Sequence, residues 1–191
     1  MATYAKTGFW PAQIQGNQVL VKRFPVTAAN GTNIFRGDVV ANASTGGVIP
    51  ATADTGTTQV GTVVALYDSN GVPVGSPNSS VATKYLPSTT AGFADVACAL
   101  PNTIFVAYAG NNTNIASDAD IFASLDHVAT AGSTTTAVSG HVLNGSTKNT
   151  EANFQILGRV DMPDNAYGTY VGVYVRFLES MWGQVNPTTG V

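Results

Sequence analysis

The sequence predicts an all-β fold, which its composition, a strand-like alternation near the C-terminus and recurrent turn signals all favour. Only 10% of the 191 residues are charged, against about 25% in an ordinary soluble domain. Thr, Ser, Asn and Gly fill the polar positions; Thr with Val favours strands, whereas Gly and Asn favour turns. The length is that of one domain with a sizeable core.

The last predicted strand has one apolar face and a second face that is not cleanly polar. Two strand-like runs within residues 153–179 flank a turn cluster that contains Pro163 and Gly168. Pro fixes its φ angle and Gly adopts a positive φ, so the chain is expected to reverse its direction here. In the second run, apolar residues alternate at the period of a strand: Val171, Val173, Val175 and Phe177. The opposite face is aromatic with one Arg and consists of Tyr170, Gly172, Tyr174, Arg176 and Leu178. We expect this face to meet a second surface.

The earlier strands are predicted from short apolar runs that end in turn residues. They cover residues 18–24, 36–41, 48–49, 59–67, 93–100, 103–108 and 138–143. Residues 68–71 give a hairpin signal, and residues 101–102 are expected to join the strands before and after them as a tight pair. Residues 75–92 are rich in Ser, Thr, Pro and Gly, which predicts a surface loop insertion long enough to make contacts.

One short helix is expected at residues 117–126. Ser117 as N-cap with Asp120 three residues later approximates a capping box. Ile121 and Leu125 then form an apolar i,i+4 stripe. The helix is about two turns long and is expected to close one end of a barrel.

The chain is divided into an N-terminal arm (1–17), a β-barrel domain (18–180) and a C-terminal tail (181–191). The arm carries Tyr4, Phe9 and Trp10 ahead of a proline, and the tail carries Trp182. The arm's aromatic residues either pack back on their own barrel or dock onto a neighbouring subunit, as large aromatic anchors do at interfaces. Trp182 offers a second anchor of the same kind.

The patterns expected of an enzyme or a cofactor site are missing from the sequence. His127 and His141 lie on different predicted elements, with no cluster of further ligands at metal-site spacing. Ser139 lies two residues before His141, which places the two side chains on one strand face without aiming them at each other. We therefore expect no enzymatic activity, no metal and no cofactor.

Charge and hydropathy narrow the classes of partner. The net charge is −3 and the eight basic residues are scattered, so nucleic-acid binding lacks its electrostatic signature. No apolar run approaches the roughly 18 residues of a membrane helix, and the N-terminus lacks the pattern of a signal peptide. We expect synthesis in a cytoplasm and contacts to partners through apolar area and neutral hydrogen bonds. Cys98 lies alone in an apolar run and is expected to be a buried hydrophobe.

Three further segments carry a family resemblance. They are residues 35–40 (FRGDVV), 99–105 (ALPNTIF) and 154–168 (FQILGRVDMPDNAYG). A Leu-Pro-x-Thr-x-Phe segment, then a strand, then a Pro-Asp-Asn turn before the final strand resembles the head decoration, or cement, proteins of tailed bacteriophages. The resemblance covers residues 35–177, without the loop at 75–92 or the Trp-bearing tail.

The resemblance implies a compact β-barrel or β-tulip with one short helix. It also implies a homotrimer on the outer capsid surface of the virion, made in the bacterial host cytoplasm, which binds the major capsid protein and stabilises the expanded shell. The family has no catalytic residues to transfer, and its coat-binding arm would correspond to residues 1–17. Candidate contacts to the coat or to a neighbouring copy are Tyr4, Phe9, Trp10, Tyr170, Tyr174, Arg176 and Trp182.

Two other functions stay open at this point. One is another virion component, such as a minor coat or tail or fibre-base protein. The other is a glycan-binding β-sandwich module, for which Tyr167, Tyr170 and Tyr174 are the only local aromatic cluster.

Overall fold

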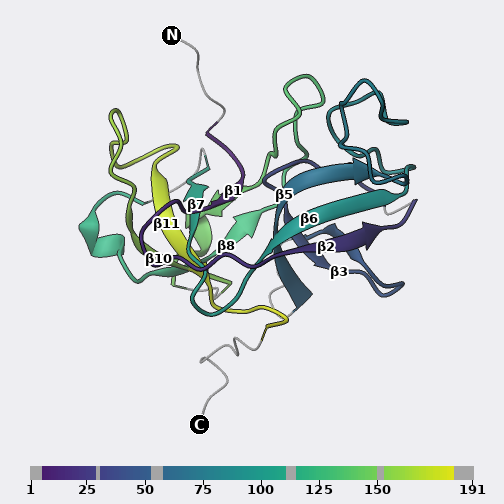
Figure 1. Ribbon diagram of the computed structural model, residues 1–191. Coiled ribbons are helices and arrows are strands. Elements are labelled where there is room, and N and C mark those ends of the chain that lie inside the picture. The colour runs from purple at the N-terminus through teal and green to yellow at the C-terminus, as the bar shows by residue number, and fades with distance from the viewer. Residues whose placement is uncertain (1–5, 29–30, 53–57, 111–114, 150–152, 183–191) are drawn as a thin grey trace.

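Two antiparallel sheets make up nearly all the regular structure of the chain (Figure 1). The computed structural model describes residues 6–28, 31–52, 58–110, 115–149 and 153–182. The all-β prediction is confirmed, and one of the sheets curls into a half-barrel. In Figure 1 the strands β7, β11, β10 and β8 lie on the left, and β5, β6, β2 and β3 lie on the right.

The six-stranded sheet combines strands from both ends of the described chain. Its order is β1 (Phe9–Pro11), β7 (Phe105–Tyr108), β11 (Gly172–Phe177), β10 (Phe154–Arg159), β8 (Ser124–Val128) and β9 (Val142–Asn144). The five-stranded sheet has the order β2 (Val21–Val26), β6 (Gly92–Cys98), β5 (Gln59–Asp68), β3 (Val39–Asn42) and β4 (Val48–Pro50). Apart from β3–β4, β5–β6, β8–β9 and β10–β11, the neighbours within a sheet are not consecutive strands.

The strands β3, β5 and β6 of the five-stranded sheet carry buried residues on both faces. Val39 of β3 and Ala97 of β6 belong to the core shared with the six-stranded sheet. Val40 and Val96, their neighbours on the same strands, belong to a second core on the other face. A strand that is covered on both faces need not alternate apolar and polar residues, as residues 63–66 (VVAL) of β5 show.

The segment between β5 and β6 covers that second core. Its residues Val81 and Leu86 are buried, and the backbone of Leu86 pairs with Ile34 in an isolated bridge. Residues 75–92 are therefore not only a surface loop, as predicted, because two apolar side chains among the Ser, Thr and Pro residues belong to the second core. The hairpin predicted at residues 68–71 is confirmed, since Asp68 N–H donates to the Val72 carbonyl at 2.9 Å.

The C-terminal hairpin forms as predicted. Strands β10 and β11 pair antiparallel, and the alternating set from Val171 to Phe177 is fully buried. Asn165, in the predicted turn, is buried, and its side-chain amide donates to the carbonyls of Val160 and Gly172 at 2.6 and 2.8 Å. Its side-chain oxygen accepts the Gly172 N–H at 2.7 Å, so one amide side chain joins the two strands at their turn.

The predicted helix at residues 117–126 is wrong. The capping box of Ser117 and Asp120 is present, but it opens only a single 3-10 turn, η2 (Asp118–Asp120). Ile121 already has extended backbone angles, and Phe122 has a positive φ of 73°. The chain then enters β8, whose backbone groups pair with β10 and β9 instead of forming helical hydrogen bonds. A second 3-10 turn, η3, spans Gly145–Thr147.

The predicted pairing of strands 93–100 and 103–108 is also wrong. The first strand, β6, lies in the five-stranded sheet, and the second, β7, lies in the six-stranded sheet. The short connection through Pro101 and Asn102 is exposed and carries the chain from one sheet to the other. A tight connection therefore marks a sheet change here rather than a hairpin.

Candidate functional site

The outer face of the six-stranded sheet brings together residues that are far apart in the sequence. Trp10 of β1 pairs with Val106 of β7, and Val106 pairs with Tyr174 of β11. Directly opposite residues of paired strands share one face of a sheet, so these three side chains form a row. All three are half-buried, whereas the alternate residues of the same strands, such as Phe9 and Val173, fill the core.

Two neighbours extend this row, which we call the outer-face row (Trp10, Val106, Tyr174). Arg176 lies two residues beyond Tyr174 on the same face, and its Nε donates to Gln155 Oε1 on β10 at 2.9 Å. Tyr108 pairs with Gly172, and partial burial raises the pKa of its phenol. The face thus offers aromatic and aliphatic surface with one tethered cation.

The structure separates the other predicted contact residues from this row. Tyr4 lies outside the described residues. Phe9 is fully buried, with its ring 5.0 Å from that of Phe154. Because β1 pairs with β7, the Phe9 side chain points into the core of the same chain. Its prediction as a contact residue is therefore wrong. Tyr170 is 40% exposed in the turn before β11, with a φ of 61°.

Trp182 closes the core instead of projecting from it. Its indole Nε1 donates to the Val60 carbonyl at 2.8 Å, and its ring packs against both apolar cores. Lys22 Nζ lies 5.3 Å from the ring centroid. Trp182 as a whole is half-buried.

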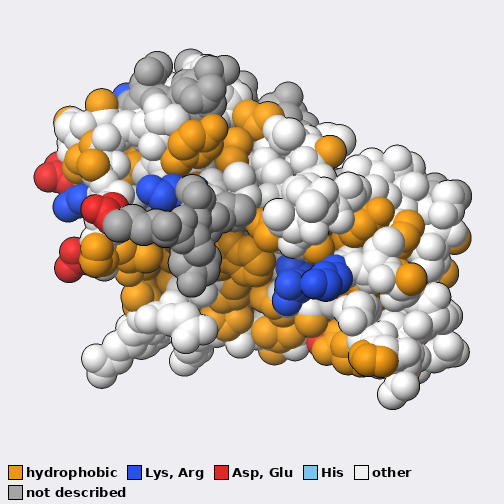
Figure 2. Space-filling model, turned by 90° about the horizontal axis from the view of Figure 1, so that it is seen from above, with side chains coloured by type: hydrophobic (Ala, Val, Ile, Leu, Met, Phe, Trp, Pro, Cys, Tyr) orange, Lys and Arg blue, Asp and Glu red, His pale blue; other side chains and the backbone are white. Residues whose placement is uncertain are grey.

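The molecular surface carries few charges between its apolar areas. Figure 2 shows hydrophobic side chains gathered in the middle of one face, with Lys, Arg, Asp and Glu side chains at a few separate places. The exposed large apolar side chains of the described residues also include a run at the start of the five-stranded sheet's edge strand: Val19, Leu20 and Val21.

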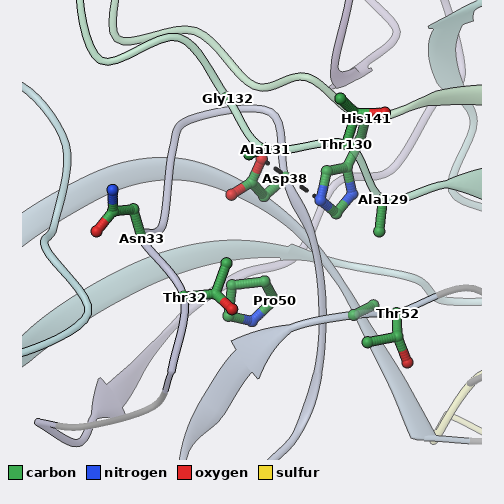
Figure 3. A pocket seen from close by; sticks show the side chains of 11 residues that line it. Thr32, Asn33, Asp38, Pro50, Thr52, Ala129, Thr130, Ala131, Gly132 and His141 are labelled. Atoms are coloured by element: carbon green, nitrogen blue, oxygen red, sulfur yellow. Dashed lines mark ion pairs between the residues drawn. The ribbon is translucent and has the colours of Figure 1, made fainter.

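A pocket of about 150 Å³ lies where the loop 129–132 meets the start of β3 and the end of β4 (Figure 3). Asp38 and His141 form its inner end and point toward each other, with Asp38 Oδ1 and His141 Nε2 separated by 3.7 Å. The mouth is lined by exposed residues with short side chains: Thr32, Thr52, Ala129, Thr130 and Ala131. The sequence reading missed this site, because its two polar groups lie about 100 positions apart.

Burial controls the ionisation of both groups. Burial raises the pKa of Asp38 to about 7, against the opposing hydrogen bonds from Ser139 and the Phe35 N–H. Burial also lowers the pKa of His141 to about 3, with a further contribution from the nearby His127. At neutral pH the imidazole is therefore uncharged, and the carboxyl group is close to its midpoint.

The nearby serine is not aligned as a nucleophile. Ser139 Oγ accepts the backbone N–H of His141 at 3.0 Å, and His141 Nδ1 accepts the backbone N–H of Val39 at 3.3 Å. A serine nucleophile would need its hydroxyl to donate to an imidazole nitrogen. Residues 36–38, which spell Arg-Gly-Asp, lie in a turn ahead of β3, since the Asp38 N–H donates to the Phe35 carbonyl at 3.2 Å.

Within the described ranges, no three His, Cys, Asp or Glu side chains gather closely enough to hold a metal ion. The helical turns of those ranges are all too short to cross a membrane. Comparison with known proteins finds no matching family model, no matching curated protein and no matching solved structure.

Proposed function

We propose that this chain is a non-enzymatic virion structural protein, a head decoration (cement) protein that binds the outer capsid surface of a tailed bacteriophage. In this proposal it acts as a homotrimer that bridges copies of the major capsid protein and stabilises the expanded shell. The proposal rests on the sequence resemblance of residues 35–177 and on one structural observation, the outer-face row.

The outer-face row supports a role in assembly because its side chains are large and lie on a rigid sheet. Trp10 and Tyr174 lie on three paired strands, so their backbone positions are fixed before binding. Aromatic residues on such a platform are the common anchors of protein interfaces. Arg176, already oriented by Gln155, can donate its remaining N–H groups to carbonyl or carboxylate groups of a partner.

The physics of multivalency makes weak contacts sufficient. A trimer that touches several coat subunits gains effective concentration at its second and third contacts. Because such a protein binds the assembled shell and not dispersed subunits, its binding free energy stabilises the shell by mass action. A surface with few charges also allows copies to lie beside one another without strong repulsion.

The first test is the copy number of this chain in purified virions, measured by quantitative mass spectrometry relative to the major capsid protein. A near-stoichiometric ratio is expected. A few copies per particle would instead favour a tail or fibre-base component, and shells formed by this chain alone would favour a coat protein. Complete absence from virions would overturn the proposal.

The second test assigns the contact face. Purified protein is added to expanded shells, and bound protein is measured after sedimentation, with the oligomeric state determined by light scattering. Tyr174→Ala is expected to weaken attachment at least tenfold, since truncating an anchor at a hot spot costs about 2 kcal/mol or more. Tyr67→Ala removes a half-buried tyrosine from β5 and is the matched control. Equal weakening by both variants would reject the outer face as the contact.

A further inference from the structure

The pocket of Asp38 and His141 contains a hydrogen-bond acceptor and a donor that the protein itself leaves unused. Among the described residues, Asp38 Oδ1 has no hydrogen-bond partner, although the side chain is only 2% exposed. Its other oxygen, Oδ2, accepts the Phe35 N–H at 2.8 Å. A buried acceptor without a partner costs about 1–3 kcal/mol, so its retention in a pocket points to a ligand.

The histidine supplies the matching donor. Since His141 Nδ1 accepts the Val39 N–H, the single proton of the neutral imidazole resides on Nε2. That N–H faces Asp38 Oδ1, but the separation of 3.7 Å is too long for a hydrogen bond between them. The unused acceptor and the unused donor are therefore neighbours in the lining of the pocket.

The two groups select the chemistry of the ligand. An ammonium group can only donate and would leave the Nε2–H unsatisfied, whereas a carboxylate can only accept and would face the Asp38 carboxyl group. A hydroxyl group both donates and accepts. It also fits either state of Asp38, whose pKa of about 7 keeps both states populated at neutral pH.

The size and walls of the pocket favour a ring with several hydroxyl groups. A cavity of about 150 Å³ accepts a six-membered ring, whereas one water molecule takes roughly 30 Å³. The lining adds neutral hydrogen-bonding side chains and small apolar surfaces, which suit the hydroxyl and C–H faces of a sugar: Thr32, Asn33, Thr52, Thr130, Pro50 and Ala51. Apart from Asp38, no lining residue carries a formal charge at neutral pH.

We propose that this pocket binds a monosaccharide unit, the terminal sugar of a glycan, through one hydroxyl group held between Asp38 Oδ1 and His141 Nε2–H. The exposed mouth at residues 129–132 leaves room for the rest of the glycan. This activity is separate from the attachment to the shell, since the pocket shares no residue with the outer-face row.

The test is ligand-observed and protein-observed NMR on the full chain. The probes are methyl glycosides of glucose, galactose, mannose and N-acetylglucosamine, with acetamide as a small neutral amide. Ala131→Leu blocks the mouth at an exposed position and leaves both buried groups in place, and Asp38→Ala removes the acceptor. Ala119→Leu, at an exposed alanine outside the pocket, is the matched control.

At least one glycoside is expected to shift the amide signals of residues 129–132 and to bind the wild type and Ala119→Leu equally. Binding should fall at least tenfold in Ala131→Leu and in Asp38→Ala; if Asp38→Ala does not fold, Ala131→Leu decides alone. The proposal is overturned if no glycoside shifts these signals, or if Ala131→Leu binds as the wild type does. Acetamide shifts as large as those of any glycoside would likewise reject a sugar ligand.

Discussion

At the scale of single residues, the buried pair Asp38 and His141 shapes how stability depends on pH. The raised pKa of Asp38, about 7, means that the folded protein keeps a proton which the unfolded chain loses near pH 4, so stability falls as the pH rises toward 7. The lowered pKa of His141, about 3, has the opposite effect: stability rises between pH 3 and the ordinary histidine value of about 6.5. Between roughly pH 4 and 6.5 the two contributions cancel.

Removing one partner should expose the contribution of the other. With His141→Gln we expect the free energy of unfolding to decrease from pH 4.5 to 6.5, and with Asp38→Asn we expect it to increase, by roughly 1 kcal/mol per pH unit in each case. His127, 5.4 Å from His141 between ring centroids, and its neighbour Asp126 are unchanged in both variants. Urea titrations at several pH values measure the slopes. Parallel pH profiles for the wild type and both variants would contradict this account.

Phe9 and Trp10 are adjacent residues with opposite roles. Phe9→Ala should lower the free energy of unfolding by about 3–5 kcal/mol, because it empties a fully buried position between β7 and β10. Trp10→Ala should cost clearly less stability, since its half-buried ring lies on the outer face, but should weaken attachment to shells. Denaturant unfolding and shell sedimentation separate the two effects. A larger stability loss for Trp10→Ala would contradict the strand register.

At the scale of elements, the segment between β5 and β6 is held in place by one carboxylate. Asp68 is fully buried and accepts the backbone N–H groups of Ser80, Val72 and Asn70 at 2.8, 2.9 and 3.0 Å. It also accepts the hydroxyl groups of Ser79 and Ser80. These hydrogen bonds, that of the Ser80 backbone first, lower the pKa of Asp68 to about 2. The hairpin and the cover of the second core thus share one anchor.

Asp68→Asn should loosen this cover while the sheets remain folded. The amide group replaces one acceptor oxygen by a donor, so N–H groups that now bind the carboxylate lose their partner. We expect faster amide hydrogen exchange at Ser80 and through residues 81–86. Asp95→Asn, which breaks the exposed ion pair with Arg23 (2.7 Å), is the control. Equal exchange in the segment for both variants would reject the anchor.

At the scale of the whole molecule, the low charge of the surface sets how binding responds to salt. With a net charge of −3 and 10% charged residues, the proposed attachment to shells rests on apolar area and neutral hydrogen bonds. We expect the affinity to change less than threefold between 50 and 500 mM NaCl, because screening acts on charges. Sedimentation binding across this salt range measures it, and a loss of tenfold or more would indicate a charged interface instead.

The sequence was sufficient for those parts of the fold that depend on local pattern. The alternation from Val171 to Phe177, the turn at Asn165 and the capping box at Ser117 could be predicted because neighbours in the chain determine them. The helix expected at residues 117–126 and the role of Phe9 could not be, because β8 and β1 are fixed by pairing with distant strands. The pocket was missed for the same reason. A hydrogen bond from the Val39 N–H to His141 brings together residues that are 102 positions apart in the sequence.

The position of β11 has a consequence for synthesis. It is the last described strand, yet it lies between β7 and β10 in the middle of its sheet. On the ribosome, β7 lacks its partner β11 until about 70 further residues have been made, which takes roughly 3–14 s at ordinary rates of translation. During this time its unpaired backbone groups on that side can pair with other chains. Folding is thus completed late and through non-local contacts, which slows it. Cellular yield should therefore depend on chaperones that shield the nascent chain, more than on the stability of the finished protein.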